Sequence, residues 1–202
     1  MALNTTIKAG LFEGVPGDPR HPGQTVIALS PGEGVLSAVE VRKVLGADLI
    51  VGAGAWGYSA AFETLEYGHR AHGNGGVYAI VDDVLLQDDV ESLHGWLRCG
   101  WANPAFNPIA VYLGGGLVYY GPFGVARDSV GLAFASAFFG TAERNIAARA
   151  PSETILELTY SMAVSAKLAV EPDLQYIISP GGDRTLRNGV IIGARLIASY
   201  DL

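Results

Sequence analysis

The feature that most constrains the fold is the alternation of apolar and polar residues over the last third of the chain. In residues 168–179 the apolar positions are Leu168, Val170, Pro172, Leu174, Tyr176 and Ile178, and the polar ones include Glu171, Asp173 and Gln175. Successive side chains of a β-strand point to opposite faces, so this period of two predicts a strand with one apolar and one polar face. Segments 34–43, 153–164 and 188–200 alternate in the same way. A soluble sheet hides its apolar face, whereas a membrane barrel turns it toward lipid.

Ten strand-like segments follow one another along the chain. They run over residues 3–13, 34–43, 47–58, 76–87, 93–102, 109–120, 129–140, 153–164, 168–179 and 188–200. The connections after even-numbered segments are mostly short, and those after odd-numbered segments are mostly longer and rich in turn formers, such as 14–33. Bacterial outer-membrane barrels show this asymmetry. No linker divides the chain, so we predict one all-β domain over residues 1–202, an antiparallel transmembrane β-barrel.

Composition excludes several classes of function. Half of the residues are apolar, 16% are charged and 27 are glycine, which suits a transmembrane barrel and also a glycine-rich soluble β-protein. The net charge of −7 argues against binding to nucleic acid, whose phosphates need a basic surface. The single cysteine, Cys99, leaves no intrachain disulfide, and no Cys/His cluster has metal-ligand spacing. No Ser/His/Asp or Cys/His arrangement has supporting context, so neither an enzyme nor a cofactor is predicted.

The start of the chain gives a separate indication of location. Residues 1–8 have no charged region followed by an apolar stretch, so we expect no signal peptide in them. Taken alone, this predicts a cytoplasmic protein. If the chain is an outer-membrane protein, its own beginning is missing.

Three blocks near the end of the chain form a recognisable signature. They are Glu157-Leu158-Thr159-Tyr160, then Glu171-Pro172-Asp173-Leu174-Gln175-Tyr176 leading to Pro180-Gly181-Gly182, and then Gly193-Ala194-Arg195. Shorter matches lie upstream, including Gly54-Ala55-Trp56 and Gly76-Val77-Tyr78-Ala79. In this order, over nearly all 202 residues, the chain resembles the OprB family, the carbohydrate-selective porins of Gram-negative outer membranes.

The resemblance implies passive diffusion of sugars and small solutes through a barrel in the bacterial outer membrane, in contact with its lipid and without a cofactor. It also implies sixteen strands, of which this chain carries about ten, as the C-terminal part of a longer barrel. Regular-polygon geometry gives a backbone radius of about 16 Å for sixteen strands and about 10 Å for ten. The ten strands alone would therefore form a pore too narrow for a sugar. Tyr200 lies two residues before the end, whereas such barrels usually finish on an aromatic residue.

Polar residues of the alternating segments are the candidates for lining the pore, because sugar hydroxyls both donate and accept hydrogen bonds. They are Glu40, Arg42, Arg98, Glu157, Glu171, Asp173, Gln175 and Arg195. The alternative is that they only brace the wall through cross-strand ion pairs. Aromatic residues near strand ends are expected to form girdles at the membrane interfaces. The candidates are Trp56, Trp96, Trp101, Tyr78, Tyr119, Tyr120, Tyr160, Tyr176 and Tyr200.

Two other functions remain compatible with the sequence. The chain is either a non-conducting barrel fragment with a structural or partner role, which needs an N-terminal half, or a soluble β-sandwich that binds sugar. In the sandwich, the charged residues would face outward and the apolar faces would pack together. A homo-oligomer such as a trimer is also compatible with the sequence.

Overall fold

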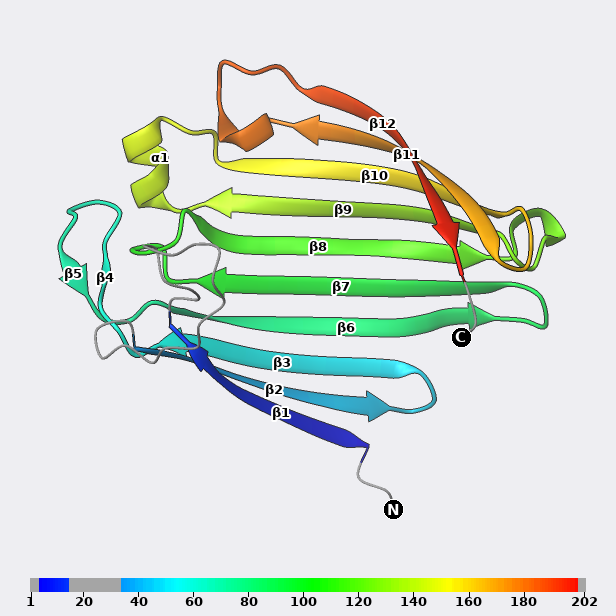
Figure 1. Ribbon diagram of the computed structural model, residues 1–202, viewed down its shortest axis with the longest axis horizontal. Helices are drawn as coiled ribbons and strands as arrows, with labels where there is room; N and C mark the ends of the chain where they lie inside the picture. The colour runs from blue at the N-terminus through cyan, green and yellow to red at the C-terminus, as the bar shows by residue number, and fades with distance from the viewer. Residues whose placement is uncertain (1–3, 15–33, 200–202) are drawn as a thin grey trace.

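The computed structural model describes residues 4–14 and 34–199, and these residues form one large antiparallel sheet (Figure 1). Its strands are β1 (Thr5–Glu13), β2 (Val35–Leu45), β3 (Leu49–Tyr58), β6 (Gly75–Gln87), β7 (Ser92–Ala102), β8 (Ile109–Tyr120), β9 (Ser129–Phe139), β10 (Ser152–Ala163), β11 (Leu168–Ile178) and β12 (Gly189–Ala198). Each of the ten predicted strands is confirmed, with ends within two residues of the prediction. The Pro-rich segment 15–33 and Tyr200 lie outside the described residues.

The sheet is a meander in which each strand pairs with its neighbours in the chain. The order runs β1-β2-β3-β6-β7-β8-β9-β10-β11-β12, and every pairing is antiparallel. β1 and β12 are the two edges, so the sheet is an open part of a barrel rather than a closed one. The all-β prediction of about ten antiparallel strands is confirmed.

The two ends of the sheet differ as the connection lengths predict (Figure 1). One end, at the left of the view, carries the long connections, with the hairpin of β4 (Phe62–Glu63) and β5 (Arg70–Ala71), helix α1 (Thr141–Ala147) and the 3-10 turn η2 (Pro180–Gly182). The opposite end carries the short turns and the 3-10 turn η1 (Pro122–Gly124). The sequence did not predict the β4–β5 hairpin or α1. Within the described residues, no helix is long and apolar enough to cross a membrane.

The apolar side chains lie on an exposed face rather than in a core. Among the described residues, Ile80 is the one buried hydrophobic side chain, at 7% exposure. Val39, Leu158 and Ile192, one from each of three strands, are 45%, 47% and 81% exposed. A soluble sandwich would pack such a face against a second layer, but besides the ten-stranded sheet the described residues supply only the small β4–β5 hairpin. The architecture therefore resembles a barrel wall.

Candidate functional site

The strand registers place the predicted site residues on one face of the sheet, here called the polar face. Arg42 lies opposite Gly52, which lies opposite Ile80, which in turn lies opposite Arg98. Directly paired residues of neighbouring strands point to the same side, so both arginines belong to this face. The same rule and the alternation along each strand place the other six here too. They are Glu40, Glu157, Glu171, Asp173, Gln175 and Arg195.

The first polar group, the β1–β7 cluster, is centred on Glu40. The carboxylate of Glu40 accepts hydrogen bonds from Arg42 Nε at 2.7 Å and from the Tyr78 hydroxyl at 2.8 Å. Lys8 Nζ lies 3.9 Å from the same carboxylate. Four strands, β1, β2, β3 and β6, are thus spanned by one network. Lys8 and Tyr78 come from strands other than that of Glu40, and neither is among the site residues predicted from the sequence.

The β1–β7 cluster continues onto β7 through a second ion pair. Arg98 Nη2 lies 3.3 Å from Asp82 Oδ1, and its guanidinium lies over the Trp96 ring, 4.9 Å from the centroid. An arginine stacked on an indole is attracted to the negative face of the ring. Its guanidinium and the Asp82 carboxylate remain partly exposed on the polar face. They are therefore accessible to a solute at this face.

The second polar group, the β10–β12 cluster, is richer in acid. Gln175 Nε2 donates to Glu157 Oε2 at 3.1 Å and to Asp173 Oδ1 at 3.4 Å. Within the described residues, neither of these carboxylates has a salt-bridge partner. Glu171 pairs with Arg195 Nη1 at 2.8 Å, and the arginine side chain is 71% exposed. The cluster therefore offers several acceptor oxygens that no described residue engages in an ion pair.

A lane without charge separates the two clusters. It runs over β8 and β9, where the polar face carries Gly114, Gly116, Gly131, Ala133 and Ala135. Three strand spacings separate β7 from β10, which is about 14 Å along the sheet. The polar face thus has two charged regions with an uncharged strip between them, in which the Tyr112 side chain lies over Gly114 of the same strand.

The aromatic residues predicted to form girdles divide between the two faces of the sheet. Trp101 and Tyr176 lie on the apolar face near the long loops, and Tyr119 and Tyr160 lie on it near the short turns. Other members of the predicted set lie on the polar face, where they cannot form a lipid-facing girdle. These are Trp56, Tyr78, Trp96 and Tyr120. In each case the residue is an even number of positions from polar-face residues of its own strand, so its side chain points to the same side.

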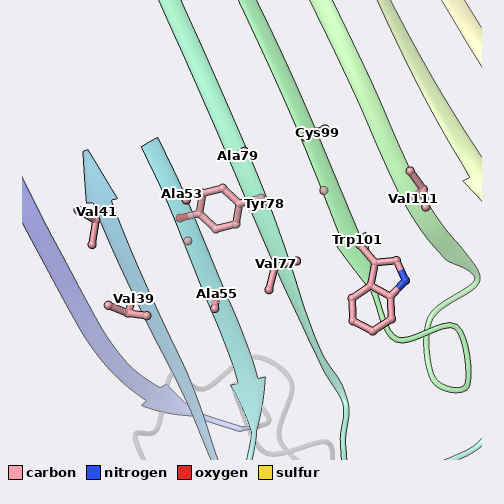
Figure 2. A pocket seen from close by; sticks show the side chains of 12 residues that line it. Val39, Val41, Ala53, Ala55, Val77, Tyr78, Ala79, Cys99, Trp101 and Val111 are labelled. Atoms are coloured by element: carbon pink, nitrogen blue, oxygen red, sulfur yellow. The ribbon is translucent and has the colours of Figure 1, made fainter. Parts of the chain in front are cut away.

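The apolar face is hollowed over β2, β3, β6, β7 and β8 (Figure 2). The cavity there has a volume of about 690 Å³. Small side chains, including Ala53, Ala55, Ala79 and Cys99, form its floor, and larger ones, including Val39 and Trp101, stand around it. Cys99 is exposed on this face as a small residue of β7. In the described part of the chain, no group of three or more His, Cys, Asp and Glu residues is arranged to hold a metal ion.

The Pro180-Gly181-Gly182 block of the signature holds a loop against the sheet. The backbone N–H of Gly181 donates to the Glu153 carboxylate, and its carbonyl accepts from Arg149. Arg149 also pairs with Glu143 of α1 at 2.6 Å and lies over the Phe139 ring, 5.3 Å from its centroid. The loop after β11 is therefore joined to the connection between β9 and β10.

A second set of hydrogen bonds that holds a connection in place lies at the opposite end of the sheet, just before β9. Asp128 is 6% exposed, and its carboxylate accepts hydrogen bonds from the Ala163 backbone N–H at 2.9 Å and the Tyr160 hydroxyl at 2.7 Å. These two bonds, the backbone one first, hold the pKa of Asp128 below its usual range. The short turn between β8 and β9 is thereby joined to the end of β10.

Comparisons with known proteins agree with this architecture. The high-pH structure of Pseudomonas putida OprB superimposes with a TM-score of 0.87 at 18% sequence identity, which shows a shared fold. The match covers 98% of this chain and 56% of the OprB chain, so this chain spans little more than half of its length. The comparison with curated proteins found no match. The family model for carbohydrate-selective porins, OprB family, matches residues 3–200. The chain therefore belongs to the OprB family of carbohydrate-selective porins.

Proposed function

We propose that this chain forms part of the wall of an outer-membrane pore through which carbohydrates and small solutes diffuse passively. The observation that carries the proposal is the separation of side chains between the two faces of the sheet. Most charged and amide side chains of the strands lie on the polar face, whereas exposed aliphatic side chains cover most of the other face, which also carries Glu13, Lys43 and Asp83 toward strand ends. Lipid solvates the apolar face, and water and solute meet the polar one. Family membership supports a transport channel rather than an enzyme.

The polar face supplies the chemistry that a sugar needs. A sugar hydroxyl donates one hydrogen bond and accepts others, so a matching wall needs both carboxylates and cationic donors. The β10–β12 cluster provides acceptors in Glu157 and Asp173, and the β1–β7 cluster provides donors in Arg42 and Arg98. No bond is made or broken, and each contact is weak and solvated enough for the solute to leave.

The open edges require additional strands for this function. A sheet edge in lipid leaves backbone N–H and C=O groups without partners, each at a penalty of several kcal/mol. The described chain has two such edges, β1 and β12, and spans 56% of the OprB chain. We therefore expect strands outside this chain to pair with both edges and widen the barrel to a diameter that admits a sugar.

A permeability assay tests the proposal. The chain is folded in detergent, with and without a polypeptide supplying the remaining porin strands, and reconstituted into liposomes. Swelling in glucose and arabinose is compared with swelling in a large dextran. We expect swelling in the small sugars when the edges are completed. Absence of sugar-dependent swelling in both preparations would refute the proposal, and stability as a monomer without detergent would favour a soluble sugar-binding module.

The same open edges favour a second function, that of a non-conducting fragment which acts as a partner in a larger barrel. Under this alternative the chain alone inserts into bilayers but passes no solute. Conductance by the chain alone in a planar bilayer would exclude it. Conductance only after addition of the missing strands would support it for the isolated chain and would agree with the porin function of the assembled barrel.

A further inference from the structure

On the polar face, several glycines lie directly opposite a larger side chain of the neighbouring strand. The pairs are Gly52 with Ile80, Gly54 with Tyr78, Gly76 with Trp56, Gly116 with Trp96, Gly131 with Thr159, and Gly193 with Asp173. In every pair, atoms of the larger side chain occupy the space that a Cβ on the glycine would need. The larger side chains therefore lie down over the neighbouring strand instead of standing away from the wall.

Tyr78 shows the consequence most clearly. Its ring extends from β6 across Gly54 of β3, and its hydroxyl donates to Glu40 of β2 at 2.8 Å. Figure 2 shows the ring directed from β6 toward the neighbouring strand, beside Ala53. A side chain at position 54 would stand between the ring and Glu40. The absence of a side chain at Gly54 thus allows one hydrogen bond to link strands that are two positions apart.

Trp96 is held flat in a similar way. A Cβ on Gly116, opposite it on β8, would lie 2.8 Å from the indole Nε1 and 3.0 Å from Cε2. The guanidinium of Arg98 lies over the same ring. Trp96 borders the uncharged lane, so its inclination decides how far the lane is open to a solute.

We propose that Gly54 and Gly116 are positioning residues that set the bore of the pore by allowing Tyr78 and Trp96 to lie flat against its wall. The inference rests on the proposed function. Ordinary contacts to a Cβ begin at about 3.4 Å, so alanine at position 116 forces the Trp96 ring to move by at least about 0.6 Å. The same Cβ would lie 3.0 Å from the backbone carbonyl oxygen of Leu132, but that oxygen belongs to the β8–β9 ladder, which together with the β7–β8 ladder holds the backbone in place. The ring therefore moves into the lumen and narrows it.

The position of the ring is measured first, because this measurement does not depend on conduction. Trp96 is made the sole tryptophan by Trp56→Phe and Trp101→Phe, and its quenching by acrylamide is recorded in the folded, membrane-inserted chain. We expect Gly116→Ala to increase quenching of Trp96. Gly189→Ala is the matched control, because Gly189 lies on the same face with no other atom within 4 Å of its Cβ position. Equal quenching in the two variants would overturn the inference.

The bore is measured second, by single-channel conductance and by exclusion of polyethylene glycols of graded size. We expect Gly116→Ala to lower the conductance and to exclude smaller polymers than the unchanged protein does. Removal of the ring by Trp96→Ala in the same variant should reverse both effects, which a general folding defect would not allow. An unchanged conductance in Gly116→Ala would refute the bore-setting role. A lack of conductance in the unchanged assembled protein would instead refute the proposed function, and the quenching result would still decide the position of the ring.

Discussion

The burial of Ile80 leads to a prediction about the stability of the polar face. Ile80 is 7% exposed, and both its side chain and the aliphatic stem of Arg42 lie over Gly52. A Cβ at Gly52 would be 2.8 Å from Ile80 Cγ1 and 3.1 Å from Arg42 Cγ. Ile80 thus fills the wall beside the arginine that binds Glu40. Ile80→Ala should therefore destabilise the fold and loosen the β1–β7 cluster.

The magnitude follows from the atoms removed. Ile→Ala deletes three carbon groups, and each buried CH₂ contributes about 0.8 kcal/mol, which gives about 2.4 kcal/mol. Incomplete collapse of the resulting space adds to this, so we expect a loss of about 2–4 kcal/mol in the free energy of unfolding. Ile191 is the matched control, since it lies on the same face but is 47% exposed. Because about half of its surface is already in water, Ile191→Ala should lose roughly 1 kcal/mol.

Unfolding by guanidinium chloride in detergent micelles, followed by tryptophan fluorescence, measures both variants. The dependence of the unfolding free energy on denaturant concentration should stay unchanged, so that the shift in midpoint reports stability alone. In addition, Ile80→Ala should reduce sugar permeability through the loosened Arg42, whereas Ile191→Ala should not. If Ile80→Ala loses no more stability than Ile191→Ala, the packing of Ile80 over Gly52 does not stabilise the wall, and the reasoning is wrong.

Three further predictions concern charge, pH and a loop. Replacing Glu157 by Gln together with Asp173 by Asn should shift the ion selectivity of the pore toward anions, measured by reversal potential in a KCl gradient. The effect should become smaller as the salt concentration rises, because the Debye screening length falls to about 3 Å at 1 M salt. Asp128→Asn should destabilise the fold at neutral pH. Folding lowers the pKa of Asp128, so the stabilisation that its carboxylate provides is present above the unfolded-state pKa of about 3.9 and is lost as the pH falls through the folded-state pKa. The unfolding free energies of the variant and the parent should therefore converge at acid pH. Gly182→Ala should cost about 1–3 kcal/mol, because φ is +67° there and the Phe139 ring occupies the Cβ position, and should speed trypsin cleavage of the loop.

Each of these has a control and a contrary outcome. Glu66→Gln removes a carboxylate from the exposed loop between β4 and β5, and should leave the reversal potential unchanged. An equal effect of this variant would place the selectivity outside the polar face. For Asp128, a constant difference between variant and parent across the acid range would contradict the pH argument. For the loop, Gly68→Ala is the comparison, because Gly68 also has a positive φ but no neighbour within 4 Å of its Cβ position. Equal destabilisation would show that the Phe139 contact contributes nothing.

The strands were predictable because their signal is local. In β11, six alternating apolar residues and the turn formers on either side decide the element without reference to any other strand. Helix α1 had no such signal, since it has seven residues and its N-cap, Gly140, makes no side-chain hydrogen bond. The β4–β5 hairpin consists of two residues on each strand, too few to show alternation.

The sequence predicts which face of its strand each site residue occupies, but it does not predict which residues of neighbouring strands pair, because that depends on strand register. Alternation places Glu40 and Arg42 on one face, but it does not say that Lys8 of β1 pairs with Glu40. Tyr78 is different, because it shares its parity with Ile80 and Asp82 in β6. Alternation alone would have assigned it to the polar face. Its aromatic character led to the girdle prediction instead, since an aromatic residue suits both a lipid interface and a lumen wall.

The charges at the two edges argue against direct closure of this chain on itself. Lys8 of β1 and Arg195 of β12 are both polar-face cations, and their side chains are 64% and 71% exposed. Each is held on one side by an acid of the inner neighbour, Glu40 or Glu171, and its outer side faces the open edge. If β1 paired with β12, Lys8 and Arg195 would lie on neighbouring strands. Like charges on paired strands destabilise the pairing. Additional strands with acidic or amide side chains on the lumen face could instead accept hydrogen bonds from both Lys8 and Arg195. We therefore expect the edges to accept such strands in preference to each other, and crosslinking between cysteines placed in β1 and β12 should be inefficient in the assembled pore.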